Sequence, residues 1–420
     1  MSEQPWLSTK DPTPVRQPDR SGAVDRGGVR ITYSVYGAAG PTLLLMPTWA
    51  IVHSLFWKGQ IGYLARHYRV VTFDGRGSGD SDRPVGAEAY RDEEYAADAL
   101  AVLDATETDR AVAVSLSSGV MWSLHLAADH PDRVAGLVAI GAVCSFPVGP
   151  QARKQAWASR LDTTEGWAKY NRHYLLEGGY DDFVEFFFGQ VFSEPRSTKQ
   201  AEDSVRWAHQ TTPQVVADST DGRMGHGGAS TPAEEVARRV QCPVLAIHGT
   251  DDQIRPPAIS ERLVELTGGE LILLEGCGHS PGARDPVKVN HLIKKFADTI
   301  YPRPEPGPRH TWVRAQSRPK KALYLSSPIG LGHARRDLAI AAELRKHHPD
   351  LQIDWLAQPP VTRVLDDAGE TVHPASSWLA NESKHIEDES GEHDLHVFQA
   401  FRRMDQILVN NFHVFNDVVD

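Results

Sequence analysis

One serine stands in surroundings that suit a nucleophile. Residues 111–128 read AVAVSLSSGVMWSLHLAA, an apolar run followed by small residues and a helix-forming stretch. Ser115, Ser117 and Gly119 occupy the defined positions of G-x-S-x-G, with serine in place of the first glycine. In this pattern a sharp strand-to-helix turn holds the middle serine in a strained conformation, and the helix start presents backbone N–H groups. Ser117 is therefore the candidate nucleophile, and an ordinary strand-to-helix turn is the alternative.

Two later segments supply an acid and a base. The apolar run that ends at Gly249 is followed by Asp251 and Asp252, and the run 271–274 is followed by His279. In a Ser-His-Asp triad the histidine accepts the serine proton, and the carboxylate holds the imidazole tautomer and stabilises its charged form. Taken singly, the aspartates could cap a turn and the histidine could lie in a surface loop. Three such residues at successive strand ends favour a triad.

The surrounding elements predict a mostly parallel sheet. Helix-like stretches such as 95–105 separate most of the short apolar runs. Continuous apolar runs are typical of strands covered on both faces, and strands that alternate with helices form a parallel sheet between two helix layers. The runs expected to form strands are 29–37, 42–46, 69–73, 111–114, 135–141, 243–249 and 271–276.

Three stretches fall outside this alternation. Residues 1–23 are polar and contain prolines, which predicts a flexible lead-in to a main domain over 24–300. From about 145 to 239 aromatic, helix-like segments replace core-type strands, which predicts a helical cap over the site. Residues 301–320 carry prolines at alternate positions, so a stiff, extended linker is expected there.

Residues 29–300 resemble the α/β-hydrolase superfamily. DGRGSGDSDRP, residues 74–84, is similar to the loop after the family's fourth strand, and GCGHSP is similar to its histidine loop. HGTDD is similar to the family's HGxxD segment, which selects Asp252 over Asp251. The resemblance implies an α/β-hydrolase fold and a mechanism that needs no cofactor and no metal. An aspartate nucleophile would indicate a dehalogenase or an epoxide hydrolase, but Ser117 stands at that position.

The same resemblance indicates two oxyanion-hole donors, which must point at the developing negative charge. One is the amide of Ser118, the residue after the nucleophile. The other comes from the loop after 42–46, where the family often has His-Gly before the donor. This chain has Pro47 and Thr48 there, so Trp49 is the candidate donor. Proline cannot donate, and the absence of glycine stiffens the loop.

A second α/β pattern follows the linker. It begins with KALYLSS, PIGLGH and a helical stretch, and it resembles the first strand, loop and helix of the acceptor-binding half of GT-B glycosyltransferases. Gly330, Gly332 and His333 are the carried-over positions, where the glycines would admit a ligand at a helix N-terminus. A plain turn with a helix-capping histidine is the alternative. Because a GT-B enzyme needs two such halves, 321–420 is expected to be a partial Rossmann-like half-domain without glycosyltransferase activity.

Composition limits the partners. The net charge of −11 without a basic stripe argues against nucleic acid and anionic membranes. Three cysteines form no disulfide framework, the N-terminus lacks an apolar signal region, and no apolar run reaches the roughly 18 residues of a membrane span. We expect a cytoplasmic protein that acts on a small-molecule acyl substrate.

Three functions are therefore considered. The first is a serine hydrolase of a carboxylic ester or related acyl bond. The second is a cofactor-free C–C hydrolase or perhydrolase of the same fold. The third is a non-catalytic, ligand-sensing domain attached to a glycosyltransferase. Aromatic residues of the expected cap favour an apolar or aromatic acyl group: Trp157, Trp167, Tyr170, Tyr174 and Phe187.

Overall fold

The chain divides into two compact units, one formed by residues 17–302 and the other by the remaining residues. The computed structural model describes residues 14–37, 39–148, 151–195, 198–228, 231–302, 320–328, 330–390 and 397–419. Residues 1–13 of the expected lead-in and 303–319 of the expected linker lie outside this described part.

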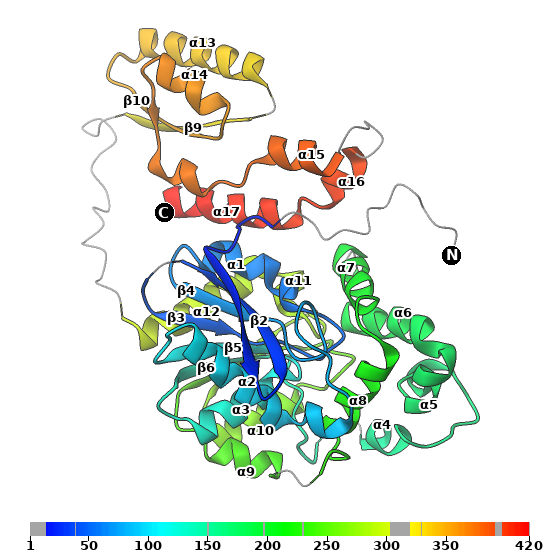
Figure 1. The fold of residues 1–420 in the computed structure, drawn as a ribbon. Coiled ribbons are helices and arrows are strands. Elements are labelled where there is room, and N and C mark those ends of the chain that lie inside the picture. The colour runs from blue at the N-terminus through cyan, green and yellow to red at the C-terminus, as the bar shows by residue number, and fades with distance from the viewer. Residues whose placement is uncertain are drawn as a thin grey trace. The chain divides into compact units, whose positions relative to one another are not determined.

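The larger unit is built on an eight-stranded mixed sheet with the order β1-β2-β4-β3-β5-β6-β7-β8 (Figure 1). The pairs β1·β2 and β2·β4 are antiparallel, and the other pairs are parallel. The mostly parallel sheet expected from the apolar runs is confirmed. The strands are β1 Arg20–Arg26, β2 Val29–Tyr36, β3 Thr42–Leu45, β4 Arg69–Phe73, β5 Ala111–Leu116, β6 Val134–Ile140, β7 Val244–Gly249 and β8 Glu270–Leu274.

The first strand departs from expectation. β1 begins at Arg20, inside the range 1–23 that was expected to be a lead-in. It is an edge strand that pairs with β2, and its residues are exposed or half-buried. An edge strand of this kind needs no continuous apolar run, so its sequence, RSGAVDR, lacks the signal of the covered strands.

Helices cover both faces of the sheet because alternate strand residues point to opposite sides. In β5, Val112 and Val114 enter the apolar cluster on the side of α1 and α12, while Ala111 and Ala113 enter the cluster on the side of α2, α3, α9 and α10. Figure 1 shows these two layers. The helices are α1 Lys58–Leu64, α2 Asp92–Ala105, α3 Gly119–Asp129, α9 Ala233–Arg238, α10 Ala258–Thr267, α11 Pro281–Arg284 and α12 Pro286–Ile300.

Among the described residues, six α-helices come between β6 and β7, where the sequence predicts a helical insertion. Besides α9 they are α4 Gln151–Ala156, α5 Arg172–Tyr174, α6 Tyr180–Val191, α7 Thr198–Ala208 and α8 Pro213–Arg223. Side chains from this region bury a third apolar cluster that also includes Trp49 and Ile254. By contrast, α9 packs against α3 and α10. The last helix of the expected 145–239 range therefore belongs to the main helix layer.

The smaller unit contains a three-stranded parallel sheet with the order β11-β10-β9. Gly330 precedes α13, and the His333 amide donates to the Gly330 carbonyl over 3.0 Å. A Cβ atom added at Gly330 or Gly332 would meet no atom within 4 Å, so packing does not require glycine there. The elements are β9 Lys321–Ser326, α13 Leu331–His347, β10 Gln352–Ala357, α14 Val361–Asp367, β11 Thr371–Val372, α15 Glu382–Ser390, α16 Val397–Arg402 and α17 Asp405–Val419.

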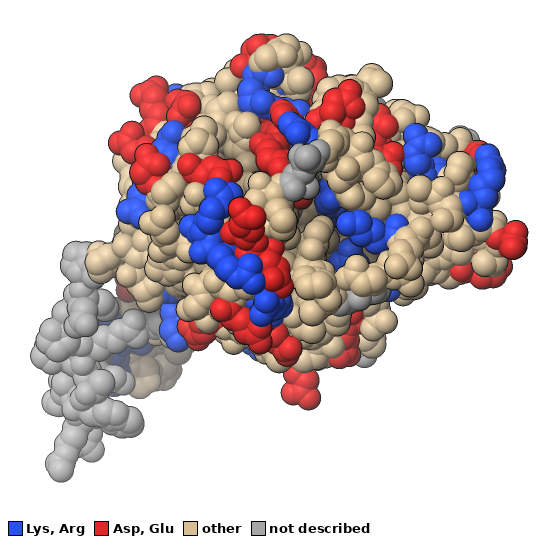
Figure 2. Space-filling model, turned by 90° about the horizontal axis from the view of Figure 1, so that it is seen from below, with Lys and Arg blue, Asp and Glu red and all other residues tan. Residues whose placement is uncertain are grey.

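None of the helices in the described part of the chain is long and apolar enough to cross a membrane. On the face drawn in Figure 2, acidic and basic side chains of the described residues are intermingled.

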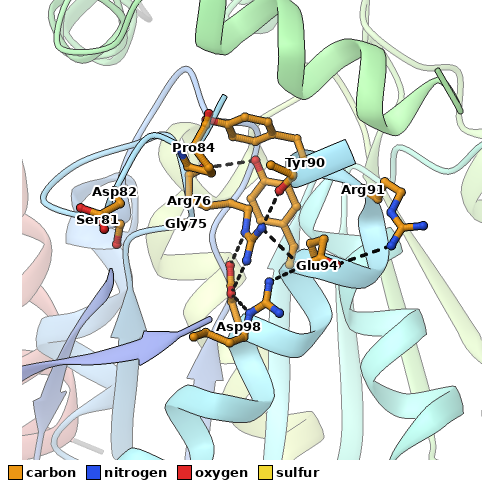
Figure 3. A network of polar contacts seen from close by, with 12 residues as sticks. Gly75, Arg76, Ser81, Asp82, Pro84, Tyr90, Arg91, Glu94 and Asp98 are labelled. Carbon is orange, nitrogen blue, oxygen red and sulfur yellow. Dashed lines mark hydrogen bonds and ion pairs between the residues drawn. The ribbon is translucent and has the colours of Figure 1, made fainter. Parts of the chain in front are cut away.

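A buried charge network holds the loop 74–84 against α2 (Figure 3). Arg76 donates to both carboxylate oxygens of Asp98 over 2.7 Å, and the two side chains are 2% and 0% exposed. Arg26 of β1 also pairs with Asp98 and with Glu94. One buried carboxylate therefore joins the first strand, the loop and α2. Because Asp98 pairs with two guanidinium groups, its removal would leave Arg76 buried without its main partner.

We predict that Asp98→Ala lowers the free energy of unfolding of the larger unit by about 3–5 kcal/mol, the usual cost of breaking a buried ion pair. Urea denaturation measures the change. Glu265→Ala is the control, because Glu265 is 63% exposed in its pair with Arg262 and should contribute no more than about 1 kcal/mol. Equal losses in the two variants would contradict the importance of this network.

The start of α3 lies very close to the loop after β3. A Cβ atom added at Gly119 would lie 2.3 Å from the Pro47 carbonyl oxygen, which is far below contact distance. Since that oxygen is part of the backbone, it cannot rotate away as a flexible side chain would. Glycine at position 119 therefore allows the loop that carries Trp49 to approach the turn that carries Ser117.

Gly119→Ala should destabilise the protein by about 1–3 kcal/mol, the usual cost of overpacking a tight contact. Thermal unfolding of the purified protein provides the measurement. Gly189→Ala is the matched control, because Gly189 lies in α6 with no atom within 4 Å of an added Cβ. That helix should gain roughly 0.5–1 kcal/mol. If Gly119→Ala is as stable as wild type, the close approach is not a constraint.

Candidate active site

Ser117 lies at the end of β5 in the left-handed backbone region, with a φ of 56°. A non-glycine residue pays an energetic cost there, and such residues concentrate at functional sites. The Ser117 amide donates to the Ile140 carbonyl over 3.0 Å, and the Val143 amide donates to the Ser117 carbonyl over 3.2 Å. Ser115 is fully buried and its hydroxyl donates to the Val138 carbonyl, so a small polar side chain is accommodated where the pattern has glycine.

The structure brings the three predicted residues together. His279 Nε2 lies 2.9 Å from Ser117 Oγ, and His279 Nδ1 lies 2.8 Å from Asp252 Oδ2. The carboxylate accepts at Nδ1, which places the ring proton there and leaves Nε2 to accept from the serine hydroxyl. His279 is 3% exposed, so the contact is shielded from bulk water. The neighbouring Asp251 is exposed and accepts from the Thr250 hydroxyl instead.

Asp252 is held as a carboxylate by four contacts. Its Oδ1 accepts from the Ile254 and Arg255 amides over 2.7 and 2.9 Å, and its Oδ2 lies against His279 and His248. Burial by itself raises the pKa of Asp252, but the two histidines and their hydrogen bonds hold that pKa well below its usual range. The carboxylate is therefore ionised at neutral pH, and its orientation is fixed from both oxygens.

His248 was not identified from the sequence as a site residue. It is fully buried in β7, with Nε2 3.1 Å from Asp252 Oδ2 and 3.1 Å from the Arg255 carbonyl oxygen. Both neighbours are acceptors, so Nε2 carries the proton and Nδ1 accepts from the Ser260 hydroxyl at 2.7 Å. His248 thus helps to orient the Asp252 carboxylate. The motif HGTDD contained this residue, but only the packing shows what it contacts.

The two expected oxyanion donors both line the pocket that contains Ser117. Within the described residues, neither the Ser118 amide nor the Trp49 amide donates a hydrogen bond. Their side chains are engaged elsewhere: Trp49 Nε1 donates to the Ser219 hydroxyl over 3.0 Å, and Ser118 Oγ accepts from Arg223.

The pocket over Ser117 has mainly aromatic and aliphatic walls. Of the five aromatic residues expected to favour an apolar acyl group, Trp167, Tyr170 and Phe187 line it. Trp157 is fully buried and donates to Asp221, and Tyr174 donates to Asp182 away from the pocket. The complete lining is Trp49, Ser117, Ser118, Val143, Arg153, Trp167, Tyr170, Phe187, Arg223, Ile254 and Arg255.

Four further charged residues contribute to the site and were not predicted. Arg153, Arg223 and Arg255 line the pocket, and Glu194 accepts from the Gly278 amide at 2.5 Å beside the histidine. Three of the four come from the inserted segment. No spacing rule connects an arginine of α4 or α8 with a serine after β5, so no sequence signal could have found Arg153 or Arg223. Arg255 lies only three residues after Asp252, but this spacing does not mark it as a pocket residue.

Candidate residues of the glycosyltransferase-like loop, Gly330, Gly332 and His333, belong to the smaller unit. Across the described ranges, the acidic, histidine and cysteine side chains form no group of three or more that could hold a metal ion.

The chain is similar to known hydrolases. A profile of the alpha/beta hydrolase fold family matches residues 41–284. A 2-hydroxymuconate semialdehyde hydrolase from Pseudomonas sp. (strain CF600) is 28% identical over 67% of this chain and 95% of its own length. The 3-oxoadipate enol-lactonase 2 of Acinetobacter baylyi is 24% identical, over 63% of this chain and 92% of its own length.

Solved structures agree with the sequence relatives. The esterase RhEst1 from Rhodococcus sp. is 25% identical, with a TM-score of 0.55, over 67% of this chain and 98% of its own. These matches cover the larger unit with its mixed sheet. Because the family profile covers more than half of the chain and the matched relatives are hydrolases, this protein is a hydrolase that belongs to the alpha/beta hydrolase fold family.

Proposed function

We propose that this protein is a serine hydrolase that cleaves a carboxylic ester or a related acyl bond through an acyl-enzyme on Ser117. The observation that carries the proposal is the continuous hydrogen-bonded chain from Ser117 Oγ through His279 to Asp252, with contacts of 2.9 and 2.8 Å. A serine in a strained turn, hydrogen-bonded to an oriented histidine, is the arrangement of an activated nucleophile.

The reaction would proceed in two halves. His279 Nε2 takes the Ser117 proton as Oγ attacks the acyl carbon, and the carbonyl oxygen becomes an oxyanion. The amides of Ser118 and Trp49 would donate to that oxygen. His279 then gives its proton to the departing alcohol, leaving the acyl group on Ser117. A water molecule, activated by the same histidine, releases the acid and restores the serine.

The inserted helices would act as a cap that sets substrate choice. Their aromatic side chains, with Trp49, form the apolar cluster beside the pocket: Trp49 makes edge contacts with Tyr170, Phe183 and Phe187 at centroid distances of 6.0, 6.2 and 5.2 Å. An apolar wall of this kind supports an acyl group with an aliphatic or aromatic body. It also excludes water from the ester before the reaction begins.

Of the two other functions considered, a hydrolase of C–C bonds or a perhydrolase remains as the alternative. A C–C hydrolase or perhydrolase would use the same serine, and the acyl pocket does not separate it from an esterase. A non-catalytic sensing domain needs no strained serine, so the backbone of Ser117 argues against it. For the smaller unit, the parallel order of β9 and β10 around α13 supports the GT-B-like half-domain inferred from Gly330, Gly332 and His333.

Ser117→Ala should lower esterase turnover by roughly 10⁴-fold or more and abolish labelling by a fluorophosphonate probe, because triad members act as a unit. A para-nitrophenyl ester assay and in-gel fluorescence measure the two effects. Cys277→Ala is the control: burial raises the pKa of that thiol, which makes it a poor nucleophile, so activity and labelling should persist. Labelling that follows Cys277 rather than Ser117 would refute the proposal.

The rate should rise with pH on the acid side of the profile, because only a neutral imidazole can accept the Ser117 proton. Asp252 should not contribute to this limb. Since its pKa is depressed, its stabilising contribution is present above the unfolded value of about 3.9 and is lost only as pH falls through the lower folded value. We therefore expect a reversible acid limb without unfolding.

A profile of kcat/KM between about pH 5 and pH 9, with circular dichroism at each point, tests this expectation. A flat profile in a chemistry-limited assay would argue against a histidine base. Loss of the folded signal in parallel with activity would assign the acid limb to unfolding instead.

A further inference from the structure

Three arginines from separate segments line the pocket that contains Ser117. Arg153 comes from α4, Arg223 from the end of α8 and Arg255 from the loop after β7. Burial lowers the pKa of both Arg153 and Arg255, and the charges of Arg255 and Arg223, respectively, lower these pKa values further. We call these three residues the arginine cluster.

Two members of the cluster are held by neutral groups. Arg153 donates to the Ile254 and Gln253 carbonyls over 2.9 and 3.1 Å, and it lies 3.2 Å from the centre of the Trp167 ring. Arg223 donates to the Ser118 hydroxyl at 2.5 Å and to the Tyr170 hydroxyl at 2.9 Å. These contacts position the two guanidinium groups, but none of them neutralises the charge.

Arg255 is the member of the cluster whose guanidinium N–H donors are unused. In the described part of the chain, its guanidinium makes no hydrogen bond and no ion pair, although its backbone is tightly anchored. Its amide donates to Asp252 Oδ1 at 2.9 Å, and its carbonyl lies 3.1 Å from His248 Nε2. The backbone of Arg255 is thus fixed relative to Asp252, the acid that orients His279. The guanidinium group of Arg255 stays available to a ligand.

Two other buried cations of the same unit are paired with acids, whereas the half-buried Arg69 donates only to hydroxyl and carbonyl oxygens. Arg76 binds Asp98 at 2.7 Å, and Lys58 binds Asp203 at 2.6 Å. Across the described residues, no carboxylate forms an ion pair with Arg153, Arg223 or Arg255. The nearby Asp252 is already occupied by two histidines, and Asp92 accepts from Trp122 Nε1 at 2.8 Å. A half-buried group of unpaired positive charges costs stability unless an anion joins it.

The cluster stays charged at neutral pH. Burial, together with Arg255, lowers the pKa of Arg153 to about 10, which still leaves it protonated. Burial and Arg223 also lower the pKa of Arg255 from the high value of an ordinary arginine. The pocket therefore presents positive charge beside the nucleophile, between the apolar walls of Trp49, Trp167 and Phe187.

We propose that the substrate is an ester or lactone that bears a carboxylate, and that Arg255 binds this carboxylate while Arg223 adds charge and the acyl carbon lies at Ser117. The proposal rests on the serine-hydrolase function proposed above. The free fork of Arg255 matches the two oxygens of one carboxylate. The terminal nitrogens of Arg223 already donate to Ser118 and Tyr170. The cluster therefore offers one guanidinium group with unused donors, whereas a phosphate dianion would engage several.

The test compares two esters with acyl chains of equal length, para-nitrophenyl hexanoate and mono-para-nitrophenyl adipate, after subtraction of spontaneous hydrolysis. Wild type should prefer the adipate ester by roughly 10-fold or more in kcat/KM. Arg255→Gln should lower kcat/KM for the adipate ester by roughly 10- to 150-fold, mainly through KM, as expected for a lost hydrogen bond to a charged group. The hexanoate ester should change less than about 3-fold, and Arg255→Lys should restore part of the preference.

Arg239→Gln is the matched control, because Arg239 is on the surface and pairs with Asp129. It should leave both substrates unaffected. If Arg255→Gln lowers both rates equally, or wild type hydrolyses both esters equally well, Arg255 is structural and the inference fails while the hydrolase function stands. If wild type hydrolyses neither ester and takes up no fluorophosphonate, both proposals fail.

Inhibition of hexanoate hydrolysis separates the possible anions. Adipate should inhibit wild type competitively, and this inhibition should weaken about 10-fold or more in Arg255→Gln. Stronger inhibition by inorganic phosphate than by adipate would overturn the assignment of a carboxylate.

Discussion

Ser117 lies in a backbone region that disfavours side chains, and the segments around it must come close enough to keep it there. Its amide and carbonyl are bonded to the end of β6 and the loop that follows. The helix after it starts at a glycine because the Pro47 carbonyl occupies the space of a side chain. The same close approach brings Trp49 to the pocket. The strained turn, the loop that carries Trp49 and the start of α3 thus depend on one set of tight backbone contacts.

Some charged side chains buried in the larger unit have partners of opposite charge, and others have only neutral partners. Two buried carboxylates are compensated within the chain: Asp98 joins Arg76 and Arg26, and Asp252 is held by two histidines and two amides. The arginine cluster differs, because its contacts are to carbonyls, hydroxyls and rings. Uncompensated charge in a pocket is a property of a binding site rather than of a core. This difference between the paired carboxylates and the arginine cluster is the basis for proposing an anionic substrate.

Much of the fold could be predicted because continuous apolar runs have few structural solutions. The run at residues 69–73 is β4 to the residue, and the other core strands lie within about two residues of the expected ends. The prediction was wrong for one exposed strand and for one helix. Strand β1 is an exposed edge with no apolar run, and α9 was assigned to the insertion although it packs in the main layer. In both cases the position in the sheet or layer, not local composition, decided the role.

By itself the sequence determined which residues could form a triad. Ser117, Asp252 and His279 each follow a core strand, and the carboxyl ends of parallel strands meet at one edge, so residues far apart in the chain converge there without further information. Only the tertiary structure decided what surrounds them. His248 faces Asp252 because of how β7 packs, and Arg153, Arg223 and Arg255 meet because two inserted helices and a strand loop fold onto one pocket. Arg153 and Arg223 reach the pocket by packing across long separations, for which single side chains leave no periodic or spaced signal.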